Sequence, residues 1–155
     1  MPYHEFIVGE EQFRLDLVTW NVNGVAINGI EVYPQASIDD DFIDYINDSL
    51  QWIKSEGPSE SFSGYGLDQY GYTVIRERES LFTFKNIIAS WKNLFHNAPT
   101  ELVITGNYGW EAGSDEGQYE MVSFNRDELI ESLNKLLEVI DLALATNQSV
   151  VHFGI

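Results

Sequence analysis

Alternation of apolar and polar residues predicts that the first third of the chain is built from strands. Two Asn-Gly pairs, at 23–24 and 28–29, supply the positive φ angles that tight hairpin turns need. At least one of these pairs should therefore reverse the chain between two strands. A proline at position 34 ends the pattern, because proline cannot donate a hydrogen bond within a sheet. The strands are expected at Phe6–Val8, Phe13–Trp20 and Ile30–Tyr33.

Three later segments carry apolar residues at spacings of three and four, which predicts amphipathic helices. Their apolar positions run over 42–53, 81–95 and 129–144, and the first and third helices are expected to end near Ser55 and Asn147. Ser37, with Asp40 three residues later, resembles the capping box that begins many helices. Asn125, with Glu128 at its third position, is the expected N-cap of the third helix.

The remaining segments predict further strands, separated by two long loops. These strands are expected at 72–79, 102–105, 118–124 and 149–153, of which 102–105 is apolar enough to be buried. The loops, at 59–71 and 107–117, combine glycine with aromatic and acidic residues. Strands first and interspersed helices later favour an α+β fold, a mostly antiparallel sheet packed against about three amphipathic helices. At 155 residues the chain fits one domain spanning 1–155.

Charge is the most distinctive property of the composition. The 25 acidic and 8 basic residues give a formal net charge of −17, which repels nucleic acid and anionic membrane surfaces and attracts basic proteins. The acids concentrate in two segments, 37–68 and 100–131, whereas 69–99 is richer in bases. This patterning favours a directed acidic surface over the alternative of uniform solubilisation. The sequence has no cysteine, signal segment or membrane-length apolar run, so we expect a cytoplasmic protein.

The sequence gives little support for catalysis, a cofactor or a metal centre. Its three histidines, His4, His96 and His152, are isolated and match no metal-binding spacing. The acidic run that starts at Asp39 lacks the alternating ligands, central glycine and terminal glutamate of a calcium loop. We therefore expect a protein without catalytic activity, a cofactor or a bound metal. The alternative is an enzyme or small-ligand-binding domain with an acid-lined pocket.

The candidate partner-binding residues fall into three groups. Asp41, Asp44 and Asp48 recur at intervals of three and four and so share one exposed helical stripe. The two long loops place aromatic rings beside carboxylates, the combination typical of binding hot spots. The loop candidates are Tyr65, Asp68, Tyr70, Tyr108, Trp110, Glu111, Asp115 and Glu116. The simpler alternative is that these rings cap the core from the loops.

One segment resembles a known class of protein. The unit from Trp91 to Pro99, followed by Leu102–Tyr108, is similar to the small immunity proteins of bacterial polymorphic toxin systems, in particular the immunity protein 70 family. The resemblance implies a protein that binds and neutralises a cognate toxin domain and carries no catalytic residues. Many such toxins are nucleases with basic clefts, which an acidic protein can occupy. A structural adaptor or a homodimer, paired through the edge of the final strand Ser149–Phe153, is the third alternative.

Overall fold

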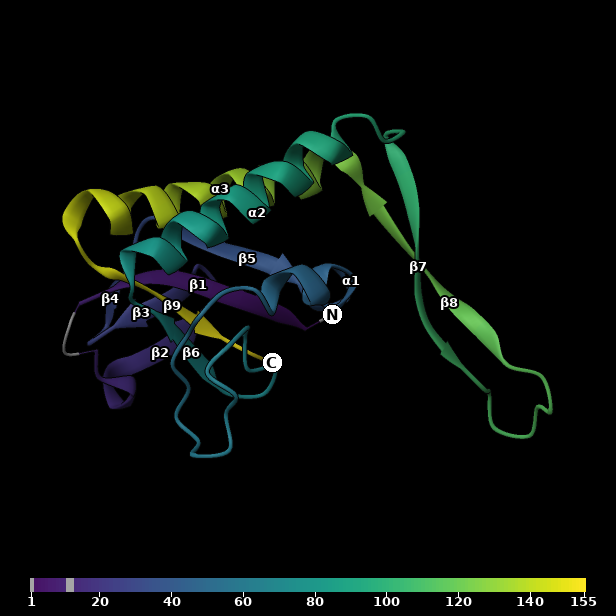
Figure 1. The fold of residues 1–155 in the computed structure, drawn as a ribbon, viewed down its shortest axis with the longest axis horizontal. Helices are drawn as coiled ribbons and strands as arrows, with labels where there is room; N and C mark the ends of the chain where they lie inside the picture. Colours follow the sequence, from purple (N-terminus) through teal and green to yellow (C-terminus); the bar gives the residue numbers. More distant parts are fainter. Residues whose placement is uncertain (1, 11–12) are drawn as a thin grey trace.

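The computed structural model describes residues 2–10 and 13–155, and a four-stranded sheet forms the centre of the molecule (Figure 1). Its strand order is β5-β1-β9-β6, and all neighbouring strands are antiparallel. The strands are β1 (Tyr3–Gly9), β5 (Gln35–Asp39), β6 (Tyr72–Ile75) and β9 (Ser149–Phe153). The predicted α+β fold with a mostly antiparallel sheet is confirmed.

Three helices cover one face of this sheet, as the periodicity predicts. They are α1 (Asp40–Leu50), α2 (Arg78–Phe95) and α3 (Arg126–Thr146). Their apolar stripes meet the side chains of Phe6, Ile38 and Val150 in one buried cluster. The longest helix, α3, has the predicted N-cap Asn125, and its C-cap is Asn147, whose φ of 54° is left-handed.

A small three-stranded sheet covers the opposite face. It consists of β2 (Val18–Asn21), β3 (Gly24–Ile27) and β4 (Ile30–Glu31), and a 3-10 turn, η1 (Leu15–Leu17), precedes it. Both Asn-Gly pairs lie at chain reversals within this sheet. Asn28 and Gly29 have φ angles of 52° and 76°, and Gly24 has a φ of 111°.

The third sheet is a two-stranded hairpin that projects from the body (Figure 1). Its strands are β7 (Glu101–Gly109) and β8 (Gln118–Asn125). Near the body, Leu102 and Ile104 are buried and lie opposite Phe124 and Val122. Beyond Ile104 every residue up to Met121 is exposed except Gly106 and Gly117, which are half-buried. The hairpin is thus rooted in the core and free along its outer half.

Several predicted boundaries in the first part of the chain are wrong. The strand expected over Phe13–Trp20 is limited to Val18–Asn21, because residues 15–17 form the 3-10 turn instead. Ser37 lies within β5, and Asp39 is the cap, its carboxylate accepting the Asp41 N–H at 3.0 Å. Helix α1 ends at Leu50, before the predicted end at 55, because isolated bridges hold residues 54 and 56 in extended backbone.

The later boundaries shift for similar reasons. The strand expected over 72–79 ends at Ile75, since α2 begins at Arg78. The segment 102–105 is not fully buried as predicted, because Leu102 and Ile104 are buried whereas Val103 is 56% exposed. Strand β7 continues to Gly109 into the predicted loop, and a register shift between Thr105 and Tyr108 accommodates it.

The final strand corrects one predicted interface. Strand β9 lies between β1 and β6, so both of its edges are paired within the chain. A homodimer cannot form through the edge of Ser149–Phe153 without dismantling the sheet. In the part of the chain that the structure describes, no helix combines the length and hydropathy needed to cross a membrane.

Candidate functional site

One face of the hairpin carries a row of exposed apolar side chains, which we call the hairpin stripe. Thr105 lies opposite Met121 and Tyr108 opposite Tyr119, so the register shift between the two pairs keeps both on the same face. Val103 precedes Thr105 by two residues and points the same way. The stripe and its exposed fractions are Val103 56%, Tyr108 50%, Trp110 65%, Tyr119 60% and Met121 62%.

The aromatic members of the hairpin stripe contact one another. The rings of Tyr108 and Tyr119 lie 4.9 Å apart between centroids, and those of Tyr108 and Trp110 lie 5.2 Å apart, both edge to face. A Cβ at Gly117 would meet the Tyr108 ring at 2.6 Å, so a larger residue there would displace this ring. The tip therefore presents a formed aromatic cluster beside a shallow hollow of about 310 Å³.

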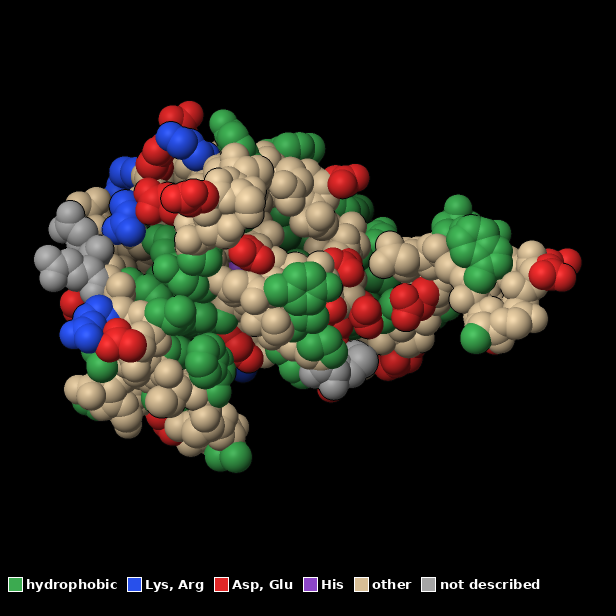
Figure 2. All heavy atoms as spheres, turned by 90° about the horizontal axis from the view of Figure 1, so that it is seen from below, with side chains coloured by type: hydrophobic (Ala, Val, Ile, Leu, Met, Phe, Trp, Pro, Cys, Tyr) green, Lys and Arg blue, Asp and Glu red, His purple; other side chains and the backbone are tan. Residues whose placement is uncertain are grey.

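Carboxylates surround this cluster, and no base balances them. Glu111, Asp115, Glu116 and Glu120 are all exposed, and the sequence has no lysine or arginine between Glu101 and Asn125. Figure 2 shows acidic side chains along the middle of the molecule and at the hairpin tip, whereas most of the basic side chains lie at the end away from the hairpin, where acids accompany them. The hairpin thus offers aromatic anchors in a negative field.

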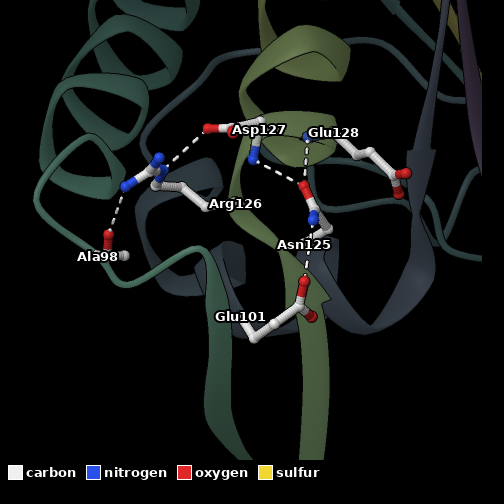
Figure 3. A network of polar contacts seen from close by, with 6 residues as sticks. All are labelled: Ala98, Glu101, Asn125, Arg126, Asp127 and Glu128. Carbon is white, nitrogen blue, oxygen red and sulfur yellow. Dashed lines mark hydrogen bonds and ion pairs between the residues drawn. The ribbon is translucent and has the colours of Figure 1, made fainter.

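Polar contacts fix the base of the hairpin between α2 and α3 (Figure 3). The Asn125 side chain accepts the N–H groups of Asp127 and Glu128 at 3.0 and 3.1 Å, and its amide donates to Glu101 at 3.0 Å. The Arg126 guanidinium donates to the Ala98 carbonyl at 3.0 Å. One junction residue therefore caps the helix and also ties the two strands together.

The predicted acidic stripe of α1 lies beside this base. Asp44 and Asp48 are exposed and Asp41 is half-buried, so the stripe is present but one member is partly covered. The Phe42 ring contacts Phe124 of β8 at 6.3 Å between centroids, which places α1 against the root of the hairpin. Partial desolvation of its carboxyl, and then the charge of Asp40, raise the pKa of Asp44.

The candidates of the 59–71 loop are Tyr65, Asp68 and Tyr70, and this loop lies apart from the hairpin, beneath the sheet near the C-terminus (Figure 1). Tyr65 and Tyr70 are 50% and 77% exposed. Asp68 is half-buried, and its carboxylate accepts the Tyr70 N–H at 3.1 Å, which stabilises the turn of the loop. The loop adjoins the C-terminal end of α1, where Gly66 donates to the Ile53 carbonyl at 2.9 Å.

A second arrangement, a buried chain of polar groups, was not predicted from the sequence. His4 Nδ1 lies 2.7 Å from His152 Nε2, and His4 Nε2 lies 2.8 Å from the Asp40 carboxylate. His152 Nδ1 lies 3.4 Å from the Thr73 hydroxyl, which accepts the Asp68 N–H at 2.8 Å. Both histidines are fully buried. The chain links the start of α1 to the centre of the sheet.

This polar chain can hold one added proton without losing a hydrogen bond. With both rings neutral, His4 donates to Asp40 and accepts from His152, which in turn accepts from Thr73. When His4 is protonated it donates to Asp40 and to His152, which then donates to Thr73. A second proton would set two N–H groups against each other across 2.7 Å. Burial, and then the charge of His4, hold the pKa of His152 well below its usual value of 6.5.

The low pKa of His152 predicts a pH-dependent share of stability. Below about pH 6.5 the unfolded chain binds a proton at this residue that the folded chain does not, so its contribution falls as the pH falls. We expect the difference in unfolding free energy between the natural chain and His152→Gln to shrink between pH 7.5 and 5, measured by urea unfolding at each pH. Titration of the acids largely cancels in this difference. A difference that is constant over this range contradicts a neutral His152.

The structure adds binding candidates that the sequence reasoning missed. Tyr119 and Met121 lie on the same face of the hairpin as Tyr108, and Glu120 lies between them on the opposite face, whereas the sequence predicts only a strand there. The alternation from Gln118 to Phe124 is the signal that could have revealed an exposed face there. No sequence spacing links His4 to His152, because 148 positions separate them.

Among residues 2–10 and 13–155, no three His, Cys, Asp or Glu side chains converge on a site that could hold a metal ion. Comparisons with protein-family models, curated proteins and solved structures found no match. The candidate functional surface therefore consists of the hairpin stripe, its carboxylates and the adjoining acids of α1.

Proposed function

We propose that this protein binds and neutralises a basic toxin domain, as an immunity protein does, and that the hairpin is its principal contact element. The observation that carries the proposal is the hairpin stripe, five exposed apolar residues on an element that projects from the body. Single exposed apolar residues are ordinary on a surface, whereas contiguous aromatic clusters rimmed by charge mark protein-binding sites.

The charge distribution supports a basic partner. The hairpin carries carboxylates without a balancing base, and α1 extends the same field at its root. Several of the basic side chains are paired with acids of the same chain, as in Lys54–Glu77, Lys85–Asp141 and Arg126–Asp127. Such a field speeds the capture of a basic protein and repels acidic competitors. A nuclease domain, with a cleft built to hold phosphates, has the complementary charge.

Co-expression is the direct test of the proposal. The toxin candidate is the protein encoded beside this gene, expressed with and without this chain. We expect protected growth and co-purification of the two proteins as a stable complex. Absence of both protection and co-purification overturns the proposal for that partner. Protection without a complex would point to a different mode of action and would also count against direct binding.

Reversal of charge on α1 is expected to slow association with that partner. Changing Asp44 and Asp48 to lysine should lower the association rate on the order of 10-fold at low salt and flatten its salt dependence. Stopped-flow measurements between low and physiological ionic strength check this. The matched control changes Glu10 and Glu79 to lysine, since both are exposed and the pair has the same change in net charge. Equal slowing by both pairs would mean that net charge, and not the α1 surface, governs capture.

A further inference from the structure

The outer edge of β5 is an unpaired strand edge of the central sheet. Strand β5 pairs with β1 on one side, and no described strand pairs with its other side. The Asp40 N–H donates to the Pro2 carbonyl at 3.2 Å, which makes the even-numbered residues of β5 the ones bonded to β1. By the alternation of antiparallel ladders, the N–H groups of Gln35, Ser37 and Asp39 point outward.

The opposite edge of the same sheet is covered. Strand β6 forms a bridge with the preceding loop, in which Glu56 and Val74 exchange backbone hydrogen bonds of 2.8 and 2.9 Å. Proteins commonly protect sheet edges in this way, because an open edge can pair with another chain. Among the described residues, the fold therefore closes one edge of the central sheet and leaves the other without a paired strand.

A groove of about 620 Å³ runs along the open edge of β5. The turn between β2 and β3, together with Tyr33 and Pro34, forms one side, and Ser132, Lys135 and Glu138 of α3 form the other. Tyr3, Glu5 and Ser37 also line the groove. Two exposed side chains at its rim provide apolar contact surface, because Val22 is fully exposed and Tyr33 is 64% exposed. These features match what an extended peptide needs: backbone partners and side-chain pockets.

The groove favours a basic occupant. Among the described residues that line it, two are acidic, Glu5 and Glu138, and one is basic, Lys135. The Ser37 hydroxyl donates to the Glu5 carboxylate at 2.9 Å, and burial raises the pKa of that carboxyl above its usual value. A partly buried carboxylate gains most from an incoming cation. A second copy of this chain fits poorly, because two chains of net charge −17 would repel each other.

We infer that β5 accepts an extended, basic segment of a partner protein as a fifth strand of the central sheet. The outward N–H groups of β5 donate to the backbone of the added strand, and Glu5 pairs with one of its basic side chains. This contact is separate from the hairpin and does not depend on the partner being a toxin. It predicts a second recognition element on a different part of the molecule.

The test uses a capped octapeptide of alternating valine and lysine as the probe. We expect its addition to slow amide hydrogen exchange at Ser37 and Asp39 at least 10-fold, measured by NMR on the full chain, with little change at Ala36 and Ile38. Ser37→Pro removes one outward N–H and leaves the ladder with β1 intact, so it should weaken peptide binding at least 10-fold. Ser37→Ala is the matched control, because it also loses the hydroxyl contact with Glu5 but keeps the N–H.

Controls on the peptide keep the inference testable if Ser37→Pro does not fold. The peptide can be N-methylated at its odd or at its even positions, and one of these two peptides should lose binding because its methyl groups replace the N–H groups that face β5. Replacing every lysine by glutamate should abolish binding. Equal binding of the lysine and glutamate peptides, or no effect of the lysine peptide at about 1 mM, overturns the inference. Protection of Ser37 in the free protein, together with a dimer in sedimentation, assigns the edge to a second copy and overturns it too.

Discussion

Replacing His4 by leucine is expected to lower the free energy of unfolding by about 3 kcal/mol. The substitution leaves His152 Nε2 buried without its partner and removes the imidazole that contacts the Asp40 carboxylate at 2.8 Å. Unsatisfied buried polar groups cost about 1–3 kcal/mol each, and leucine replaces neither hydrogen bond. Urea unfolding measures the effect as a lower midpoint at an unchanged slope.

Coupling between the two histidines provides the sharper criterion. His152→Leu alone should also destabilise the protein, because it leaves His4 Nδ1 without a hydrogen-bond partner. The double substitution should lower the free energy of unfolding by less than the sum of the two single effects, with a difference of about 1 kcal/mol or more. The exposed His96 is the control, and His96→Leu should change stability by no more than about 0.5 kcal/mol. Additive effects of the two core substitutions would contradict the chain of contacts through which we link α1 to the sheet.

Removing the aromatic cluster of the hairpin is expected to weaken partner binding by about 100-fold or more. Trp110 and Tyr119 each present more than half of their surface, and buried aromatic anchors contribute on the order of 2 kcal/mol or more apiece to an interface. The double substitution to alanine should act mainly on the dissociation rate. Calorimetry or surface-based kinetics with the co-purified partner measures the loss.

The fold itself should tolerate this change, which separates binding from folding. Both residues lie on the outer half of the hairpin, away from the buried positions at its root. Their substitution should therefore leave the unfolding midpoint nearly unchanged. Trp52→Ala is the matched control, since Trp52 is 70% exposed but lies beyond the end of α1. An equal loss of affinity from Trp52→Ala would locate the contact surface elsewhere.

Sequence patterns predicted the helices better than the strands, for a physical reason. The apolar stripes of α2 and α3 repeat over 18 and 21 residues, so several turns support each assignment. Asn125 was recognisable as a cap because its side chain bonds locally, to Asp127 and Glu128. Strand β5 is not evident from the sequence, because its pairing with β1 joins distant segments. Serine is common both at helix N-caps and at exposed strand positions, so Ser37 alone does not distinguish the two.

The candidate site was only partly predictable for the same reason. Tyr108, Trp110 and the tip carboxylates stood out in composition, whereas Tyr119 and Met121 gained significance only from the register that sets them beside Tyr108. The free edge of β5 depends on which strands fail to pair, which no local pattern encodes. Asp68 stands out in the sequence as a carboxylate beside an aromatic ring, but in the structure it accepts the Tyr70 N–H and stabilises the turn of its own loop.

The way in which the hairpin joins the body has a consequence for how its recognition could diversify. Residues 105–121 stand clear of the core, while Asn125 and Arg126 fix the direction of the strands at their root. The tip is therefore preorganised, and a partner that captures it pays little conformational entropy. If the hairpin binds the partner as we propose, new residues at the tip would alter specificity without altering the fold, and the hairpin would be an exchangeable module on a constant scaffold.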